Sequence, residues 1–367
     1  MAQQPDSKPN TPPLDPKEVP AYTQPDVKID VMGKKFLWFG ISGAVLIPGI
    51  IAIIMCMVRF GSPVKLGIDF TGGSLLQFHF ERPVKVEQLR QAVSKVTIYD
   101  RKYDPNGKAT VIGREFNIPA EIQSVVGGVS RSATSSVGSA GSTLIVRTKR
   151  LDLLQVKDLM KGLSQQHLGP FVKDSENSVG PTIGKELLRN ALIALATGII
   201  AILAYIAVRY QFDFAVCAIT AMVHDVLVMS GMFAIMSLFF GAEADSLFVT
   251  ALLTVMGFSV HDTIVIFDRF RENLRYAKKT DSFADVANRS VNQTFARSIN
   301  TSLTVALTLL PLVIFGGSSV FYFTLSMLIG VISGTYSSIF NAAPLLVLWR
   351  DGLKNKPTAP AKSGAAA

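Results

Sequence analysis

The sequence predicts a polytopic α-helical membrane protein with six transmembrane helices and one external α+β domain between the first two helices. Apolar residues make up 49% of the 367 residues and charged residues only 17%, against about 25% charged in soluble proteins. Mean hydropathy is +0.36. The two cysteines, Cys56 and Cys217, both lie in long apolar runs, which excludes a disulfide framework. The net charge of +9 is typical of a membrane protein with basic cytoplasmic loops and does not favour a nucleic-acid partner.

Six segments are long and apolar enough to be transmembrane helices, since crossing the hydrocarbon core takes about 20 residues of helix. The predicted helices comprise residues 36–58, 187–209, 213–240, 247–268, 297–316 and 320–349. Pro48 and Pro311 fall inside two of them, which membrane helices tolerate better than soluble ones. The first helix follows a long polar stretch and lacks a small-residue cleavage site, so we expect a retained anchor rather than a cleaved signal peptide.

Basic residues are concentrated at one end of these helices. The predicted basic loop 269–296 and Arg297 together carry seven, whereas the loops 241–246 and 316–320 carry none. More basic residues precede the first helix and follow the last. Since Lys and Arg are enriched in cytoplasmic loops, we expect both termini and the basic loop in the cytoplasm. The domain at 59–186 would then lie outside the inner (plasma) membrane.

Residues 59–186 form the one sizeable polar segment, and their pattern predicts an α+β domain. The expected strands are 74–80, 110–118 (as one strand or two), 143–148 and a last one from 170, and the expected helices are 86–96 and 152–167. The order β-α-β-β-α-β is typical of a ferredoxin-like fold. A Ser/Gly-rich stretch at 127–141 predicts a flexible loop.

The two ends of the chain have the composition of tails. Residues 1–35 hold seven of the 18 prolines, which predicts a disordered cytosolic tail. Residues 350–367 predict a second cytosolic tail, and its end from 357 is rich in small residues.

No motif in the sequence indicates soluble enzyme chemistry or a bound cofactor. The nearest match to a phosphate-binding loop, residues 180–186, is one residue too short and ends in Glu instead of Ser or Thr. The four histidines are scattered, and no zinc-protease or nucleophile-elbow motif occurs. We therefore expect a membrane protein that is not an enzyme and that holds no metal.

The unusual residues lie inside the predicted helices. His224-Asp225 falls in the third helix and His261-Asp262 in the fourth. An ionised Asp at a helix centre costs about 2.5–3.5 kcal/mol on insertion scales, so such residues face the bundle interior and have partners. Two interpretations stay open: structural hydrogen bonds between helices, or a relay for protons or other ions.

Two other features have both a plain and a functional interpretation. Arg297 begins the fifth helix at a depth similar to that of Asp262, so it is either the partner of that carboxylate or an anchor that reaches the membrane interface. Gly330, Gly334 and Ser338 recur at helical spacing, which favours close helix packing over a ligand site.

Several motifs occur in a familiar order. They are Gly-Ile-Asp-Phe-Thr-Gly-Gly at 67–73, Val-Gly-Pro-Thr-Ile-Gly at 179–184, Val-His-Asp at 223–225, Gly-Phe-Ser-Val-His-Asp-Thr at 257–263, Asp-Arg-Phe-Arg-Glu-Asn at 268–273 and Asn-Gln-Thr-Phe-Ala-Arg-Ser at 292–298. Over roughly residues 36–350 the chain resembles the SecD/SecF family of protein translocase subunits, in the resistance-nodulation-division superfamily. The form of the first motif is more similar to SecF than to SecD.

The resemblance implies a function in protein export. Members of the SecF branch pair with SecD, which supplies a second set of six helices. Together they assist the SecYEG channel and the SecA motor, and use the proton-motive force to pull or release the exported polypeptide on the outer side. Membrane lipids surround the complex, and no nucleic acid is involved. The alternative is a proton-coupled exporter of small molecules or lipids on the same scaffold.

The resemblance also implies roles for particular residues. Asp262 and Arg297 match the positions for proton passage, and His224, Asp225 and His261 are candidates for additional relay groups. The signature of the external domain is carried by Gly67, Asp69, Phe70, Gly72 and Gly73. Whether the coupling ion is H⁺ or Na⁺ stays open.

Overall fold

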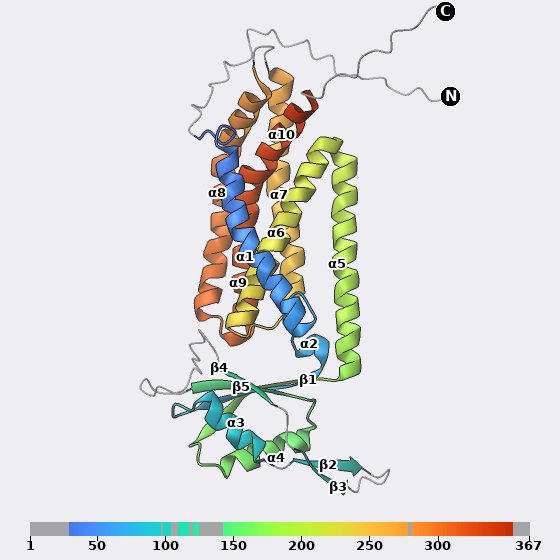
Figure 1. Cartoon of the computed structure of the whole chain (residues 1–367), viewed down its shortest axis with the longest axis vertical. Coiled ribbons are helices and arrows are strands. Elements are labelled where there is room, and N and C mark those ends of the chain that lie inside the picture. The colour runs from blue at the N-terminus through green and yellow to red at the C-terminus, as the bar shows by residue number, and fades with distance from the viewer. Residues whose placement is uncertain are drawn as a thin grey trace, which may run out of the picture.

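The structure, a computed structural model, describes residues 29–354 apart from 97, 104–108, 117–119, 125–141 and 278–280. Figure 1 shows a long helical bundle with a smaller α+β domain at one end. The predicted stretch 127–141 and most of both predicted tails lie outside the described residues.

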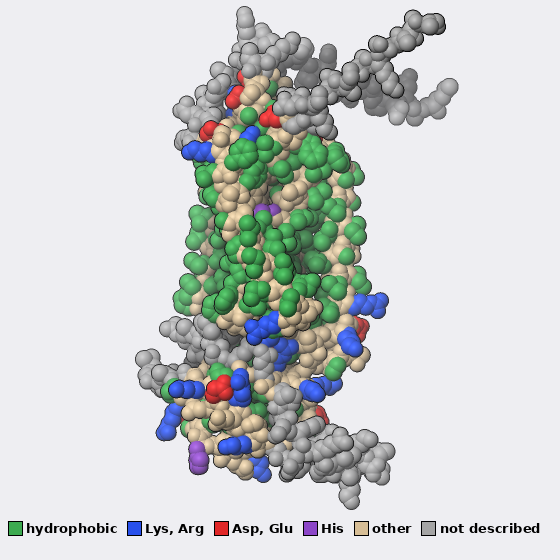
Figure 2. All heavy atoms as spheres, in the orientation of Figure 1, with side chains coloured by type: hydrophobic (Ala, Val, Ile, Leu, Met, Phe, Trp, Pro, Cys, Tyr) green, Lys and Arg blue, Asp and Glu red, His purple; other side chains and the backbone are tan. Residues whose placement is uncertain are grey.

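Six helical segments in the described chain are long and apolar enough to cross a membrane, which confirms the predicted number. They are Lys35–Phe60 (α1), Pro181–Arg209 (α5), Phe212–Phe239 (α6), Ser246–Tyr276 (α7), Phe283–Phe315 (α8) and the segment Val320–Asp351. Exposed apolar side chains cover most of the face of the bundle that Figure 2 shows. The chain is therefore a polytopic helical membrane protein.

The predicted basic loop 269–296 is wrong as a loop, because most of it is helical. α7 continues to Tyr276, and α8 begins already at Phe283. Ser282 caps α8 by accepting a hydrogen bond from the Asp285 amide, in a capping box. The two extensions pack together, and Asn273 Nδ2 donates to Ser290 Oγ at 2.8 Å between them. Buried contacts of this kind stabilise helices that polar composition alone does not predict.

The sixth span is not a single α-helix. It consists of α9 (Ser318–Ser337), a π-helical turn η1 (Ser338–Ala342) and α10 (Ala343–Lys354). Asn341 in the π turn exchanges hydrogen bonds with Ser42 of α1 at 2.7 and 2.9 Å. π turns inside α-helices occur frequently at functional sites.

The α+β domain contains a four-stranded antiparallel sheet in the order β4-β5-β1-β6. Its strands are β1 (Gly73–Phe80), β4 (Glu121–Ser124), β5 (Ser142–Thr148) and β6 (Phe171–Val179). The helices α3 (Val86–Ser94) and α4 (Leu153–Ser164) follow the predicted positions. Leu76, Phe78 and Phe80 alternate along β1 and are fully buried in one core with residues of both helices. The opposite face of the sheet is directed at the bundle.

A strand is present at the predicted position 110–118, but it lies outside the main sheet. Residues there belong to a separate two-stranded hairpin of β2 (Ile98–Tyr103) and β3 (Ala109–Phe116), whereas β4 supplies the fourth strand of the main sheet. Strand pairing is decided by non-local contacts, which a sequence pattern does not contain. A short element, α2 (Ile68–Thr71), connects the end of α1 to β1.

The last residues of the predicted disordered tail 1–35 are packed against the bundle. Val31 and Met32 are 0% and 4% exposed, in the core of the bundle. Asn288 Oδ1 accepts hydrogen bonds from the amides of both residues at 3.0 and 3.1 Å. Asn292 pairs with the backbone of Ile29 through two more bonds. Residues 29–32, here called the N-terminal strap, are therefore fastened to α8.

Candidate functional site

The carboxylate of Asp225 lies at the centre of the bundle and is fully buried. Three hydroxyls donate to it: Ser259 of α7 at 2.6 Å, and Ser333 and Ser337 of α9 at 2.7 and 2.6 Å. His224 Nδ1 lies 3.0 Å from Asp225 Oδ1. The charge of this carboxylate is thus compensated by oriented dipoles from two other helices.

The sequence places Ser259 in the motif at 257–263 but indicates no role for it, nor for Ser333 and Ser337. Ser333 and Ser337 are one helical turn apart and therefore share a face of α9. That spacing is the available signal, but small hydroxyl residues at such spacing also serve plain packing. The packing role predicted for Gly330 and Gly334 is confirmed: a Cβ on Gly330 would lie 2.4 Å from Val255, and one on Gly334 would lie 3.4 Å from Ser259.

His224 connects this cluster to the surface of the bundle. Its Nε2 atom is buried and has no hydrogen-bond partner among the described residues. The side chain is 11% exposed. It lines a pocket of about 300 Å³ between α1, α6 and α9, whose other lining residues include Ile41, Ile332 and Tyr336. Nε2 is therefore a polar atom held in an almost wholly apolar setting.

Asp262 differs from Asp225 in its partners. The residue is 2% exposed, and its Oδ2 atom is buried without a hydrogen-bond partner in the described part of the chain. His261 Nδ1 lies 4.0 Å from Oδ1, and the His261 side chain is 62% exposed. A buried carboxylate oxygen without a donor is costly when charged. Oδ2 of Asp262 therefore lacks the hydroxyl donors that both oxygens of Asp225 have, although the carboxylate keeps a side-chain hydrogen bond with Thr335.

Arg297 is exposed on α8 and makes no ion pair with Asp262 in the described structure, within 4.0 Å between nitrogen and oxygen. Its backbone carbonyl accepts a hydrogen bond from Thr301. The structure therefore does not bring these two predicted residues into contact.

The signature at 67–73 forms a close-packed joint. Gly72 and Gly73 have φ values of +73° and +135°, which L side chains rarely adopt. A Cβ on Gly72 would lie 2.9 Å from Pro181 Cα, and one on Gly73 would lie 2.7 Å from the carbonyl oxygen of Thr148. The glycines let the link after α1 touch both the start of α5 and the sheet.

The other signature residues complete this joint. Phe70 is 4% exposed, and a Cβ on Gly67 would lie 3.0 Å from the carbonyl oxygen of Ala244. Asp69 Oδ2 accepts hydrogen bonds from the amide and hydroxyl of Ser246, the first residue of α7. Within the described residues, no group of three or more His, Cys, Asp or Glu side chains is arranged to hold a metal ion.

Two known protein families match parts of this chain. The family described as "Protein export membrane protein SecD/SecF, C-terminal" matches residues 159–352. The "SecD/SecF GG Motif" matches residues 60–84, which include the joint.

Curated relatives match over most of their length. A "Protein translocase subunit SecF" from Thermobaculum terrenum is 40% identical over 328 residues, covering 88% of this chain and 94% of the relative. The subunit of the same name from a Synechocystis species is 38% identical, with 88% and 95% covered.

Two solved structures are similar to this chain. "Crystal structure of SecDF, a translocon-associated membrane protein", from a Thermus species, matches with a TM-score of 0.69 and 30% identity over 89% of this chain. "Crystal structure of SecDF in Super-membrane-facing form" matches with a TM-score of 0.55 and 32% identity. In both cases this chain spans 39% of the length of the SecDF chain. The chain therefore belongs to the SecF branch of the SecD/SecF family of protein translocase subunits.

Proposed function

We propose that this chain acts with a SecD partner in the Sec machinery and uses the proton-motive force to assist protein export. The observation that carries the proposal is the buried carboxyl of Asp262, which has an oxygen without a donor inside a membrane-spanning helix. The named relatives are protein translocase subunits, so their function is transport and not catalysis.

The two buried carboxyls support different tasks. Asp225 has three hydroxyl donors, which supply hydrogen bonds to both of its carboxylate oxygens. Asp262 has a side-chain hydrogen bond with Thr335, but its buried Oδ2 atom has no donor among the described residues, so binding a proton removes the desolvation cost of its charge. The exposed ring of His261, next to it in the chain, offers a route for that proton. One charge crossing 100 mV releases about 2.3 kcal/mol, enough to bias a conformational equilibrium.

The outer faces of α7 and α8 support a helical partner. Each carries small or polar residues at spacings of three or four, all exposed within the span. On α7 they are Thr250, Thr254, Gly257 and His261, and on α8 Arg297, Asn300, Thr304 and Thr308. Polar and small residues of this kind mark helix-to-helix contacts in membranes. These residues, here called the polar stripes, are where we place the six helices of SecD.

This placement gives Arg297 a function. A guanidinium on the outer face of α8 would meet carboxylates of the partner and not Asp262 in the present conformation. Loss of the proton from Asp262 would then attract Arg297, and protonation would release it, as α7 and α8 repack. Contacts with SecYEG, SecA and the exported polypeptide follow from the family and are part of the same proposal.

The proposed orientation rests on the charges of the two ends. The end of the bundle that holds the start of α1 and the helical extensions of α7 and α8 carries a cluster of basic residues, among them Arg271, Arg275 and Arg289, whereas Arg59 and Lys185 lie at the other end (Figure 1). That end would face the cytoplasm, with the α+β domain outside the inner membrane. We also propose a ferredoxin-like fold for this domain, supported by the strand order β4-β5-β1-β6 and by the helices α3 and α4 between strands.

The test is export of a secreted reporter into inverted membrane vesicles, with and without a proton gradient. Asp262→Asn should abolish the gradient-dependent part of export and leave the gradient-independent part unchanged. The matched control is Asp268→Asn, because Asp268 lies on the same helix but its side chain is 47% exposed. This variant should respond to the gradient like the parent chain. If Asp262→Asn still responds fully to the gradient at normal membrane levels, proton coupling through this residue is wrong.

One observation favours the alternative, a proton-coupled exporter of small molecules or lipids. The pocket beside His224 is almost wholly apolar and is wide enough for part of a lipid chain. Purification from the membrane separates the two functions. Export predicts co-purification with SecD and the SecYEG channel, whereas the alternative predicts gradient-driven efflux of lipophilic dyes without any effect on reporter export.

A further inference from the structure

The external domain and the bundle meet at the loop between α6 and α7. The amide of Gly67 donates to the carbonyl oxygen of Ala244 at 2.7 Å, and the amide of Ala244 donates to the carbonyl oxygen of Lys65 at 2.7 Å. Leu66 and Ala244 thereby form a parallel β-bridge. The link that follows α1 is thus paired, backbone to backbone, with the loop that leads into α7.

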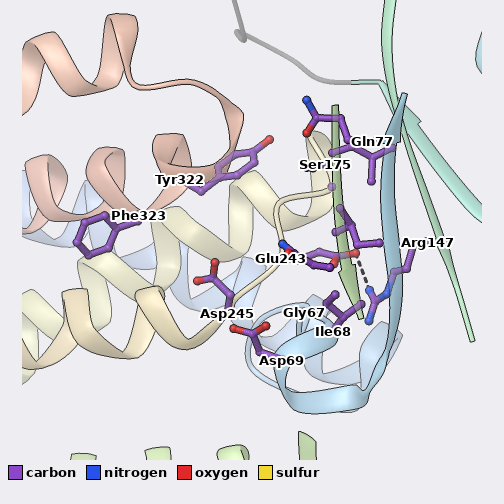
Figure 3. A pocket seen from close by; sticks show the side chains of 14 residues that line it. Gly67, Ile68, Asp69, Gln77, Arg147, Ser175, Glu243, Asp245, Tyr322 and Phe323 are labelled. Atoms are coloured by element: carbon purple, nitrogen blue, oxygen red, sulfur yellow. Dashed lines mark hydrogen bonds and ion pairs between the residues drawn. The ribbon is translucent and has the colours of Figure 1, made fainter. Parts of the chain in front are cut away.

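One guanidinium reinforces this bridge from the sheet (Figure 3). Arg147 lies on β5, and its Nη1 donates to Glu243 Oε1 at 2.5 Å. Its Nη2 donates to the carbonyl oxygen of Leu66 at 3.2 Å and to Thr71 Oγ1 at 2.8 Å. Arg147 therefore binds three segments together: the sheet, the link after α1 and the loop before α7.

The ion pair is shielded from water. The side chains of Arg147 and Glu243 are 17% and 15% exposed, and Lys65, whose Nζ lies 3.1 Å from the same Glu243 oxygen, is 9% exposed. Charge-assisted bonds in a partly buried, multidentate arrangement are stronger and more directional than surface ion pairs. Glu243 thus balances two cations at the joint.

The loop carries this contact directly to the proposed relay. Asp245 caps α7 by accepting a hydrogen bond from the Phe248 amide at 3.0 Å, two residues after Glu243. Asp262 lies 16 residues beyond Ser246 on the same helix, which is about 24 Å along the helix axis. A continuous α-helix transmits a displacement of its end along its whole length, because its backbone bonds keep the rise constant.

We propose that Arg147 is a positioning residue that clamps the external sheet to the start of α7 through Glu243, so that the sheet and α7 move as one body. The inference rests on the proposed function, since α7 carries Asp262. The clamp turns a shift of α7 caused by protonation into a movement of the external domain, where the exported polypeptide is handled.

The first test compares substitutions at the clamp in the vesicle export assay. Arg147→Gln should lower the gradient-dependent part of export about tenfold, a coupling effect of ordinary size, at normal membrane levels and with SecD still bound. Glu243→Gln should do the same, and the double variant should be no worse than either single one. Arg147→Lys keeps a charge for Glu243 and should recover part of the activity.

The matched control is another ion pair of the same domain. Arg90 and Glu87 lie on α3 and are 52% and 68% exposed. Arg90→Gln should export like the parent chain. Full gradient-dependent export by Arg147→Gln would overturn the clamp, as would an equal loss in Arg90→Gln.

The second test replaces the clamp by a covalent bond. Leu66→Cys with Ala244→Cys places two thiols across the β-bridge, and the parent chain with buried Cys56 and Cys217 serves as the oxidation control. In the Arg147→Gln background, oxidation should restore gradient-dependent export and reduction should remove it again. If the disulfide instead blocks export with Arg147 present, the joint must open during transport and the proposal is wrong.

The two proposals fail in different ways. If Asp262→Asn keeps its response to the gradient, the proposed function fails whatever Arg147 does. If Asp262→Asn loses the response but Arg147→Gln keeps it, proton coupling stands and only the clamp is wrong.

Discussion

Gly49 and Gly231 show how one missing side chain sets the distance between two helices. A Cβ on Gly231 of α6 would lie 2.6 Å from Gly49 Cα of α1, closer than any tolerated contact. The obstacle is backbone, which is unable to rotate away as a side chain can. The close approach brings α1 against α6, the helix that carries His224 and Asp225.

Gly231→Ala should therefore separate α1 from α6 and lower the stability of the purified protein. Overpacking of this kind costs about 1–3 kcal/mol. Gly43→Ala is the matched control, because a Cβ at that position of α1 has nothing within 4 Å. Thermal denaturation in detergent, followed by size-exclusion chromatography, measures both. Equal transition temperatures for the two variants would contradict the close packing.

At the scale of elements, the N-terminal strap joins the start of α1 to α8. Its backbone is bound by the two amide side chains of Asn288 and Asn292, one turn apart on α8. Hydrogen bonds from the Gly33 amide and from Asn288 lower the pKa of Asp30. The chain segment that enters the membrane is thus held on the helix that also carries Arg297.

The double variant Asn288→Ala/Asn292→Ala should release the strap. Val31→Cys reports this, because the native side chain is fully buried. A water-soluble maleimide should label Val31→Cys slowly in the parent background and at least about tenfold faster in the double variant, since each lost bond contributes about 1 kcal/mol. Asn300→Ala on the exposed face of α8 is the control. Equal labelling rates would show that the strap is held by its apolar side chains alone.

The strap should not respond to physiological changes of pH. A lowered pKa in the folded state means that the contribution of Asp30 is present above its ordinary value of 3.8 and is lost only as pH falls through the still lower folded value. Labelling of Val31→Cys relative to a free thiol standard should therefore be constant between about pH 6 and 8.

At the scale of the whole molecule, exposure is uneven around the bundle. In the most apolar 18-residue stretch of α6, and likewise of α7, 50% of the residues are buried inside the bundle. The corresponding share is 6% for α5 and 17% for α8. α5 exposes apolar side chains such as Leu192. α8 exposes the polar stripe as well. The difference distinguishes a face suited to lipid from a face suited to a partner.

Cysteine cross-linking should identify the partner face. Thr304→Cys, on the stripe of α8, should form an adduct with SecD in native membranes when treated with a short bifunctional thiol reagent and a library of SecD cysteines. Leu192→Cys on α5, where the native side chain is 58% exposed, should form none. Adducts from Leu192→Cys alone would place the partner on the opposite side of the bundle.

The sequence by itself determined the membrane class, the number of spans and the family, because these depend on composition, on runs of apolar residues and on local motifs. It also singled out Asp225 and Asp262, since a carboxylate in an apolar run is conspicuous on its own. It could not distinguish the two, because the difference lies in hydroxyls of Ser259, Ser333 and Ser337 that reach Asp225 from other helices.

Only the tertiary structure decided which residues meet. The sequence predicts that Arg297 and Asp262 lie at similar depths in the membrane. In the structure, however, Arg297 is exposed on the outer face of α8. The fourth strand of the sheet and the helical form of the segment near Tyr276 and Phe283 depend on partners distant in the chain. The sequence does not distinguish Arg147 from other residues, because a single arginine in an amphipathic strand is common. Arg147 becomes a clamp only where the fold places Glu243 and the link after α1 within reach of a single guanidinium.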